Sequence, residues 1–406
     1  MSAPPGEFAQ VLAGLDLPRL AATGQRADDA AVTATLAAAR AGGRLGLVDL
    51  AVLLSPAATG RVEELAHAAR ASTLRRFGRA VRLFAPLYVS NACLSSCTYC
   101  GFSKGLPVVR RTLSVDEAEA EARLLADRGF RHLLLVSGEH RVEVSADYLV
   151  AVVDRLSPLF PAISIETQTW SDDTYARLVD AGLVGAVHYQ ETYDRARYRE
   201  VHVAGWKRDF DRRLSSFERA GAAGVRRLGL GVLLGLAADW RADVLALAAH
   251  ATFLSRRFWR TEVLAALPRI RPNAAGFPPV VVVDDAEFVQ AHAALRLYES
   301  DLDLSLSTRE PVAMRDGLVR IAVTTMSAGS STEPGGYGTP GSAQEQFSIS
   351  DERPPDAVAA MLVAAGYDPV WKDAFPLVAG GSARLPSGGG RATAVVTGDS
   401  RPDFDR

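Results

Sequence analysis

From residue 81 onward, the hydrophobic pattern alternates between short apolar runs and longer stretches with helical spacing. Runs typical of buried parallel strands occupy residues 81–89, 132–136, 163–166, 186–190, 227–234, 262–269, 304–307 and 321–325. Between them, apolar residues recur every three or four positions over residues 115–126, 148–156, 172–181, 209–222, 242–256 and 285–297. Eight strands with helical crossovers predict an α/β fold, a closed (β/α)8 barrel of the TIM type. An open barrel of six strands is the alternative.

The segments flanking this pattern differ from it and from each other. Residues 1–26 read as a poorly ordered lead, whereas residues 27–80 have helical spacing, with Ser55 and Pro56 marking a helix start. Glycine and serine clusters at 380–382 and 387–390 predict a disordered tail. We therefore expect a helical extension over 1–80, a barrel with its C-terminal region over 81–373, and a flexible tail over 374–406.

Charge and composition exclude several classes of partner. A formal net charge of −2 over 406 residues gives no basis for binding nucleic acid or an anionic membrane. The sequence contains no uninterrupted run of about 20 apolar residues, so we expect no membrane-spanning helix. The first residues lack a basic stretch followed by an apolar one, so we expect no signal peptide and a cytoplasmic location.

All the cysteine of this chain lies in one short loop. Cys93, Cys97 and Cys100 have the spacing C-x3-C-x2-C and follow the first predicted strand. Three thiolates so spaced can ligate three irons of a cubane cluster and leave the fourth iron open to a small molecule. A disulfide framework needs an even cysteine count, and a structural zinc site needs four closed ligands. Iron–sulfur ligation is therefore the preferred interpretation.

This loop resembles that of the radical S-adenosylmethionine (SAM) enzymes. The resemblance implies a [4Fe–4S] cluster held by the three cysteines, with SAM on the open iron and Tyr99 packed against its adenine. Packing within an ordinary loop is the alternative role for Tyr99. In these enzymes an electron from the cluster cleaves SAM and releases a 5′-deoxyadenosyl radical.

Segments beyond the cysteines narrow the resemblance to the radical SAM aromatic amino acid lyases. Among these, the chain is most similar to the 2-iminoacetate synthases, the tyrosine lyases of thiamine biosynthesis. The match runs in order over roughly residues 60–373. It includes Pro86-Leu-Tyr-Val-Ser-Asn91, Ser137-Gly-Glu-His140, Tyr189-Gln-Glu-Thr-Tyr193, Pro268-Arg-Ile-Arg-Pro272, Leu304-Ser-Leu-Ser-Thr-Arg-Glu310, Glu345-Gln-Phe-Ser348 and Val370-Trp-Lys-Asp373.

The resemblance implies cleavage of the Cα–Cβ bond of L-tyrosine to 2-iminoacetate and p-cresol. It also implies a reductant such as flavodoxin or ferredoxin, and a thiazole synthase as a partner. A related lyase acting on tryptophan in a natural-product pathway is an alternative, because the stretches at 104–107, 168–170 and 270–276 depart from the thiamine pattern. A non-catalytic iron–sulfur scaffold for a thiazole synthase is a second alternative.

Several residues at the ends of predicted strands become candidates for SAM contacts. Ser137, Gly138 and Glu139 match the motif that holds the SAM amino group. Glu166 ends the third apolar strand and is a candidate for ribose or amino contacts, with a structural salt bridge as the alternative. Arg213 is a candidate for the SAM carboxylate, in competition with Arg212.

Substrate residues are expected after the seventh strand. Arg309 is the predicted clamp for the substrate carboxylate, because a guanidinium fork binds a carboxylate with two hydrogen bonds. Ser307 and Thr308 are expected to add hydroxyl contacts, and Tyr88 to line the amine region. A salt bridge between Arg309 and Glu310 is the alternative. The roles of five further residues stay open: the end of the fourth strand offers candidates for orienting the amine or phenol, and one of two arginines after the sixth strand is a candidate structural residue. They are Gln190, Glu191 and Tyr193, and Arg269 and Arg271.

Overall fold

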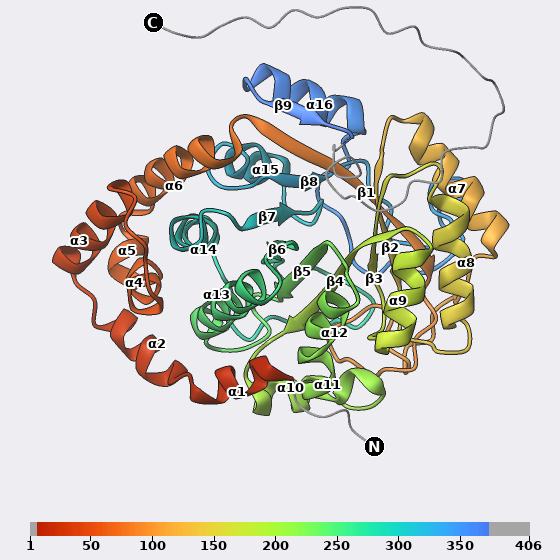
Figure 1. Cartoon of the computed structure of the whole chain (residues 1–406), viewed down its shortest axis with the longest axis horizontal. Coiled ribbons are helices and arrows are strands. Elements are labelled where there is room, and N and C mark those ends of the chain that lie inside the picture. Colours follow the sequence, from red (N-terminus) through yellow and green to blue (C-terminus); the bar gives the residue numbers. More distant parts are fainter. Residues whose placement is uncertain (1–5, 373–406) are drawn as a thin grey trace, which may run out of the picture. The chain divides into compact units, whose positions relative to one another are not determined.

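A closed parallel barrel forms the centre of the computed structural model, which describes residues 6–372 (Figure 1). The barrel strands are β1 (Ala80–Ser90), β2 (His132–Ser137), β3 (Ala162–Glu166), β4 (Leu183–Glu191), β5 (Arg227–Val232), β6 (Glu262–Ala266), β7 (Asp303–Leu306) and β8 (Thr325–Ser327). Closure is visible in the register of β1, which pairs in parallel with β2 on one side and with β8 on the other. The predicted (β/α)8 fold is confirmed.

Helices follow the strands and cover the outside of the barrel. They are α7 (Val115–Asp127), α8 (Ala146–Leu156), α9 (Asp172–Asp180), α10 (Arg195–Val201), α11 (Phe210–Leu214), α12 (Ser216–Ala222), α13 (Trp240–Arg257), α14 (Asp285–Tyr298) and α15 (Val312–Leu318). The side chains of Ser114, Ser145 and Ser171 accept backbone hydrogen bonds at the starts of α7, α8 and α9. Such caps satisfy amide groups that have no partner within the helix.

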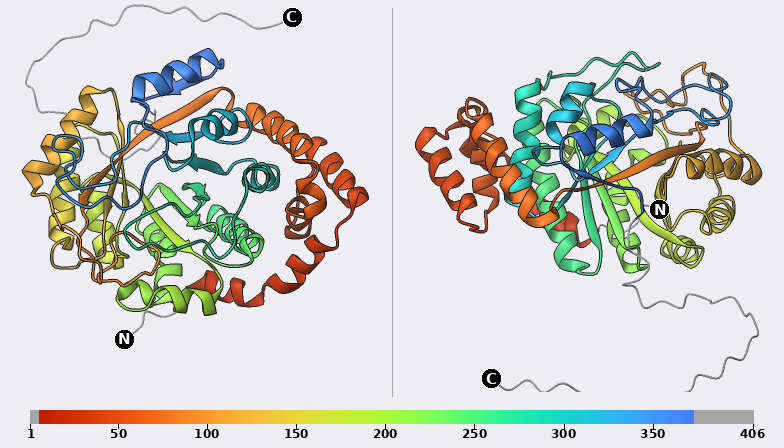
Figure 2. Two further views of the ribbon diagram at one scale, coloured as in Figure 1. Left: turned by 180° about the vertical axis from the view of Figure 1, so that it is seen from behind. Right: turned by 90° about the horizontal axis from the view of Figure 1, so that it is seen from above.

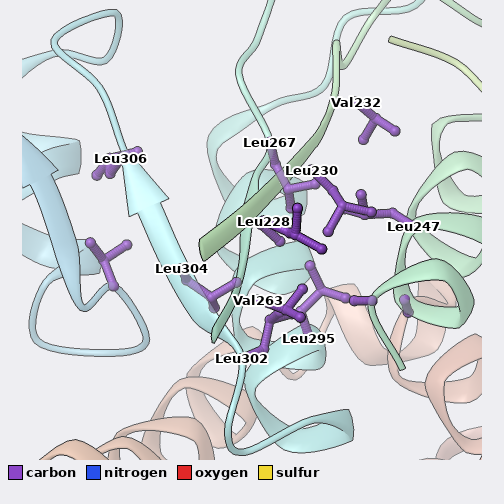
Figure 3. Packing of buried hydrophobic residues seen from close by; sticks show 14 of the residues in the cluster. Leu228, Leu230, Val232, Leu247, Val263, Leu267, Leu295, Leu302, Leu304 and Leu306 are labelled. Carbon is purple, nitrogen blue, oxygen red and sulfur yellow. The ribbon is translucent and has the colours of Figure 1, made fainter. Parts of the chain in front are cut away.

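The hydrophobic core lies between the strands and this helical layer. Leu228 and Leu230 of β5 are fully buried in one cluster with Leu247 of α13 and Leu295 of α14 (Figure 3). Alternate residues of a strand point to opposite faces. Leu228 and Leu230 therefore face the helices, and the intervening positions face the lumen that carries the chemistry.

An N-terminal group of helices precedes the barrel and curves around its α13 and α14 side (Figures 1 and 2). The helices are α1 (Glu7–Gly14), α2 (Leu17–Gln25), α3 (Asp29–Arg40), α4 (Leu47–Leu53), α5 (Pro56–Thr59) and α6 (Val62–Phe77). Ser55 caps α5 and Pro56 is its first residue, as predicted.

The prediction of a poorly ordered lead over 1–26 is wrong for residues 6–25, because most of this segment forms the helices α1 and α2. Phe8 is fully buried and stacks on the ring of His250, with ring centroids 3.9 Å apart. The Asp16 carboxylate caps α2. Tertiary packing against α13, which a local pattern does not reveal, orders this segment.

Several elements also differ from prediction. The apolar run 321–323 is not strand, because the amides of Ala322 and Val323 bond the carbonyl of Leu318 as a turn after α15, and β8 begins at Thr325. The helix expected over 209–222 is two short helices. A further strand, β9 (Asp368–Val370), follows α16 (Pro355–Ala364) and pairs with the start of β1. The predicted tail 374–406 lies outside the described residues.

Candidate active site

The cysteine loop directly follows β1, at the carboxyl end of the barrel where catalytic groups of this fold collect. Arg110 binds both sides of the loop. Its guanidinium donates to the carbonyl oxygens of Asn91 (2.7 Å), Phe102 (2.8 Å) and Ser103 (2.7 Å). The loop therefore has a fixed backbone before any ligand binds.

The three thiols line one cavity, with an empty volume of about 870 Å³. Burial raises the pKa of the Cys93 thiol to about 11 and also raises the pKa of Cys97 and Cys100. Backbone amides point at the sulfurs, from Ser95 to Cys93 and from Phe102 to Cys100, each at 3.4 Å. Buried thiols require a bound cation to become thiolates, so this donor set fits an iron–sulfur cluster.

Within residues 6–372, no three His, Cys, Asp or Glu side chains converge on a position for a single metal ion. A cubane cluster does not require such convergence, because each cysteine ligates a different iron. Ligation of a cluster by these three cysteines stays a prediction.

Gly138, at the end of β2, lies against the cysteine loop. A Cβ atom on Gly138 would lie 2.3 Å from the carbonyl oxygen of Ala92 and 3.0 Å from the Cβ of Cys93. The backbone after β2 therefore approaches the cluster loop as closely as only glycine permits. Ser137 lines the same cavity, and its hydroxyl donates to the Gly138 carbonyl at 2.9 Å.

Glu139 and Arg213, predicted to contact different groups of SAM, are hydrogen-bonded to each other at 2.9 Å. The other oxygen of Glu139 accepts from Ser95 Oγ at 3.0 Å, and Arg213 also donates to the carbonyl of Tyr189. Burial alone would lower the pKa of Arg213, but the charge of Glu139, together with smaller contributions from neighbouring groups, raises that pKa. Both side chains line the cavity, and their SAM contacts stay predictions.

Tyr99 lies in the wall of the same cavity. Its hydroxyl bonds His202 Nε2 at 2.7 Å, while His202 Nδ1 bonds the carbonyl of Tyr198 at 2.8 Å. Since a carbonyl only accepts, Nδ1 carries the proton and Nε2 accepts from Tyr99. Burial lowers the pKa of His202 well below its usual value, consistent with a neutral ring.

An ion pair that the sequence analysis missed completes this cavity. Lys207 Nζ lies 2.7 Å from Glu191 Oε1. Glu191 follows an irregularity in β4 and has φ of 70°, the one positive value at a non-glycine position within residues 6–372. A strained residue in an active site is often held there for function. The rarity of lysine could have singled out Lys207. Of the 45 basic residues in the chain, three are lysines: Lys104, Lys207 and Lys372.

A second cavity, with an empty volume of about 690 Å³, adjoins the first. Arg309, Glu166 and Tyr189 line both cavities. Arg309 rests on the ring of Phe347, with Cζ 3.4 Å from the ring centroid. Among the described residues its guanidinium has no carboxylate and no hydrogen-bond partner.

Glu310 does not pair with Arg309. It is buried and forms ion pairs with Arg269 and Arg271 instead. The alternative of a salt bridge between Arg309 and Glu310 is therefore wrong, and the open question about Arg269 has a structural answer. Pairing of Glu310 with two other arginines leaves the Arg309 fork available to a ligand.

Glu166 carries no ion pair or hydrogen bond to another described residue. Burial raises its pKa, and the positive charge of Arg309 opposes that change. A carboxyl group facing a guanidinium across a shared cavity wall can receive a cationic or hydrogen-bonding ligand between the two.

The remaining predicted substrate residues divide into two kinds. Tyr88 lines the second cavity and donates to Gln346 Oε1 at 2.7 Å. Ser307 and Thr308 also line it, but the Thr308 backbone mainly anchors the chain, because its carbonyl accepts from the amides of Ser350 and Asp351. Gln346 and Phe347 were missed as site residues, although the Glu345–Ser348 segment carried part of the resemblance.

Two candidate residues, one in β4 and one in the loop after it, do not line either cavity. Tyr193 is buried, and its hydroxyl bonds His250 at 2.9 Å near Phe8. Gln190 is fully buried and bonds the carbonyl of Phe210. Arg212, the competitor of Arg213, bonds Thr169 and stacks on Trp206 and does not line either cavity.

Comparison with known proteins identifies the family of this chain. Residues 87–248 match the family model of the radical SAM superfamily, and residues 266–368 match that of the biotin and thiamin synthesis associated domain. The chain is 42% identical over 325 residues to 2-iminoacetate synthase of Escherichia coli (strain K12), an alignment that covers 80% of this chain and 86% of the relative. The chain belongs to the 2-iminoacetate synthase family.

Other relatives agree with this membership. The 2-iminoacetate synthase of Salmonella typhimurium is 41% identical over 80% of this chain and 86% of its own length. Among solved structures, the [FeFe]-hydrogenase maturase HydG from Carboxydothermus hydrogenoformans superposes with a TM-score of 0.83 at 28% identity, covering 91% of this chain and 86% of that one. The predicted family is confirmed.

As a radical SAM lyase of the 2-iminoacetate synthase family, the protein uses a [4Fe–4S] cluster and SAM as cofactors. The spacing of Cys93, Cys97 and Cys100 falls within the part of the chain that matches the superfamily. Within residues 6–372, no helix is both long and apolar enough to cross a bilayer.

Proposed function

We propose that the protein cleaves the Cα–Cβ bond of L-tyrosine to 2-iminoacetate and p-cresol, supplying the thiazole of thiamine. The observation that carries this proposal is the Arg309 guanidinium, which lies in the wall between the two cavities with no partner among the described residues. Arg309 is partly buried, and a cation partly removed from water without a counterion favours an anionic ligand. An amino acid carboxylate fits the fork with two parallel hydrogen bonds.

The rest of the second cavity suits the other groups of an aromatic amino acid. Phe347 lies beneath Arg309 and limits where the fork can point. Glu166, across the shared wall, is placed to accept a hydrogen bond from the substrate amine and to hold its proton. Tyr88, fixed by Gln346, bounds the amine region on a third side.

A hydroxyl at the second cavity favours a phenol over an indole. Ser330 Oγ is buried, lines this cavity and has no hydrogen-bond partner among the described residues. An unsatisfied buried hydroxyl costs free energy that a substrate hydroxyl would recover. Apolar side chains such as Phe84 and Leu134 form the surrounding wall.

The cofactor side is assembled from the first cavity. Cys93, Cys97 and Cys100 would hold the cluster, and Glu139, Arg213 and Tyr99 would hold SAM. When bound, the cluster and SAM supply a 5′-deoxyadenosyl radical that removes a hydrogen atom from the substrate. The protein fixes the carboxylate at Arg309 so that the amine, and not Cβ, faces the first cavity, and it keeps water out.

Partners and location follow from this chemistry. The cluster needs a one-electron reductant, for which flavodoxin or ferredoxin is suited, and 2-iminoacetate is short-lived enough in water to favour direct transfer to a thiazole synthase. Thiols and a reduced cluster fit the reducing conditions of the cytoplasm.

An anaerobic product assay tests the proposal. The reconstituted protein, SAM and dithionite are incubated with tyrosine, with tryptophan or with phenylalanine, and products are identified by mass spectrometry. We expect p-cresol and glyoxylate, the hydrolysis product of 2-iminoacetate, from tyrosine alone. Indolic products from tryptophan would replace the substrate assignment, and a complete lack of 5′-deoxyadenosine from cluster-loaded protein would support the scaffold alternative.

A further inference from the structure

The segment 203–207 covers the outer side of the cysteine loop. Its backbone pairs with the loop, from Val203 N to Ser96 O at 3.1 Å and from Ser96 N to Ala204 O at 2.9 Å. A Cβ atom on Gly205 would lie 2.5 Å from the Cα of Ser95. This segment is therefore in direct contact with the residues between the first two cluster cysteines.

Trp206 stands exposed at the tip of this segment, with 46% of its surface accessible. The guanidinium of Arg141 lies 3.8 Å from its ring centroid and that of Arg212 lies 4.5 Å away, so the indole contacts two cations. Neither arginine has a carboxylate partner among the described residues. Burial and, to a smaller extent, the neighbouring charge of Arg212 lower the pKa of Arg141, while Glu139 opposes the change.

A groove with an empty volume of about 640 Å³ is lined by the first residues of the cysteine loop and by His140, which precedes Arg141 in the chain. Cys93 lines the groove as well as the main cavity, so the groove reaches a cluster ligand from a second side. Arg110 and Arg111 are its cations, and Glu143 is its carboxylate. His140 lines the groove, and the next residue, Arg141, contacts the ring of Trp206.

We infer that this surface, defined by Trp206, Arg141, Arg212 and the groove at Cys93, is where an acidic one-electron carrier protein docks to reduce the cluster. SAM and tyrosine fill the main cavity when the electron must arrive, so a carrier needs another approach to the cluster. Exposed tryptophan and unpaired arginine are the residue types that dominate binding at protein interfaces. The positive charges select a partner with carboxylates around its redox centre.

The inference rests on the proposed function, because it assumes an electron-dependent reaction. The test uses Arg141→Glu and Trp206→Ala in the reconstituted full chain, and it measures 5′-deoxyadenosine and p-cresol with two reductants. One is flavodoxin, kept reduced by its NADPH-dependent reductase, and the other is dithionite, a small ion that needs no docking surface. Iron and sulfide content confirm that each variant carries its cluster.

We expect Arg141→Glu to lower kcat/KM for flavodoxin at least about tenfold and to leave dithionite-driven turnover unchanged. Raising the salt concentration from about 0.05 M to about 0.3 M is expected to slow the flavodoxin-driven reaction of the natural protein and to affect the variant less. Arg70→Glu is the matched control, since Arg70 is exposed on α6 and its replacement makes the same charge change.

Equal flavodoxin kinetics for the Arg141 and Arg70 variants would overturn the docking surface. So would an equal loss with dithionite, because that loss would mean that Arg141 and Trp206 only support the cluster loop. A natural protein that makes no 5′-deoxyadenosine with dithionite would overturn the proposed function itself, and this inference with it.

Discussion

Arg309 and Glu310 are neighbours in sequence with opposite surroundings. Glu310 is buried between Arg269 and Arg271, whereas Arg309 faces the two cavities with its guanidinium unpaired among the described residues. The difference depends on a single residue, because the ion pairs with Arg269 and Arg271 occupy the Glu310 carboxylate that lies next to Arg309 in the chain. A free fork is then available for the substrate.

Replacing Arg309 by Ala is expected to reduce kcat/KM for tyrosine by about 100-fold, since two hydrogen bonds to a charged group are lost. Lys at this position should recover only part of the loss, because an ammonium lacks the planar fork. Steady-state p-cresol formation measures both variants. Arg320→Ala, at an exposed position without an ion pair among the described residues, is the control. An unchanged KM in Arg309→Ala would contradict the clamp.

Gly138→Ala should disturb the cluster and leave the barrel folded. The added methyl would press on the Ala92 carbonyl oxygen at 2.3 Å, so the cysteine loop must shift. Overpacking of this kind costs about 1–3 kcal/mol. We expect less iron per chain and weaker visible absorbance after reconstitution. Gly105→Ala is the matched control, because its Cβ would have no atom within 4 Å; equal iron in both variants would refute the effect.

At the scale of elements, the end of β4 is tied to α13 by one buried carboxylate. Asp243 Oδ1 accepts from Thr192 Oγ1 at 3.0 Å and from the amide of Tyr193 at 2.7 Å. These bonds hold the chain directly after Glu191, where the backbone adopts its positive φ. A helix on the outside of the barrel thus helps to aim a side chain into the lumen.

Burial raises the pKa of Asp243 to about 7. An unfolded Asp titrates near pH 4, so between about pH 4 and pH 7 the folded chain binds the extra proton. The contribution of Asp243 to the free energy of unfolding should therefore fall as pH rises through this window, by at most about 4 kcal/mol, and stay level above it. Denaturant unfolding of the natural protein and of Asp243→Asn, compared across pH, measures the difference. A difference that does not change with pH would contradict the prediction.

At the scale of the whole molecule, the C-terminal region of the described chain returns across the active-site end of the barrel. Asp351 is fully buried, pairs with Arg315 and Arg353, and follows the segment that carries Gln346 and Phe347. A Cβ on Gly101, within the cysteine loop, would lie 2.4 Å from the Gln346 carbonyl oxygen. The barrel, the cluster loop and this segment therefore close the site together.

Asp351→Asn is expected to destabilise the fold by about 3 kcal/mol, because it leaves the buried Arg315 without a counterion. It should also raise KM for tyrosine, since Phe347 under Arg309 loses its anchor. Chemical denaturation and steady-state kinetics measure the two effects. Glu352→Gln is the control at the adjacent exposed position. Full stability of the Asp351 variant would show that the segment is held by other contacts.

The sequence by itself determined the barrel and predicted the cluster ligands. Alternating apolar runs place the strands because burial on both faces demands it, and Cys93, Cys97 and Cys100 are adjacent enough that their spacing alone states their chemistry. Strand ends then marked Glu166 and Arg309. These features depend on residues that are close together in the sequence.

Only the tertiary structure decided which charges are paired and which are free. Glu139 with Arg213, Lys207 with Glu191, and Glu310 with its two arginines join residues up to 74 positions apart. Helix α1 is ordered by a stacking contact between Phe8 and His250, which are 242 positions apart in sequence. Local periodicity reports which face of an element is buried, but the partner that neutralises a buried charge or covers an aromatic ring is set by how distant elements pack.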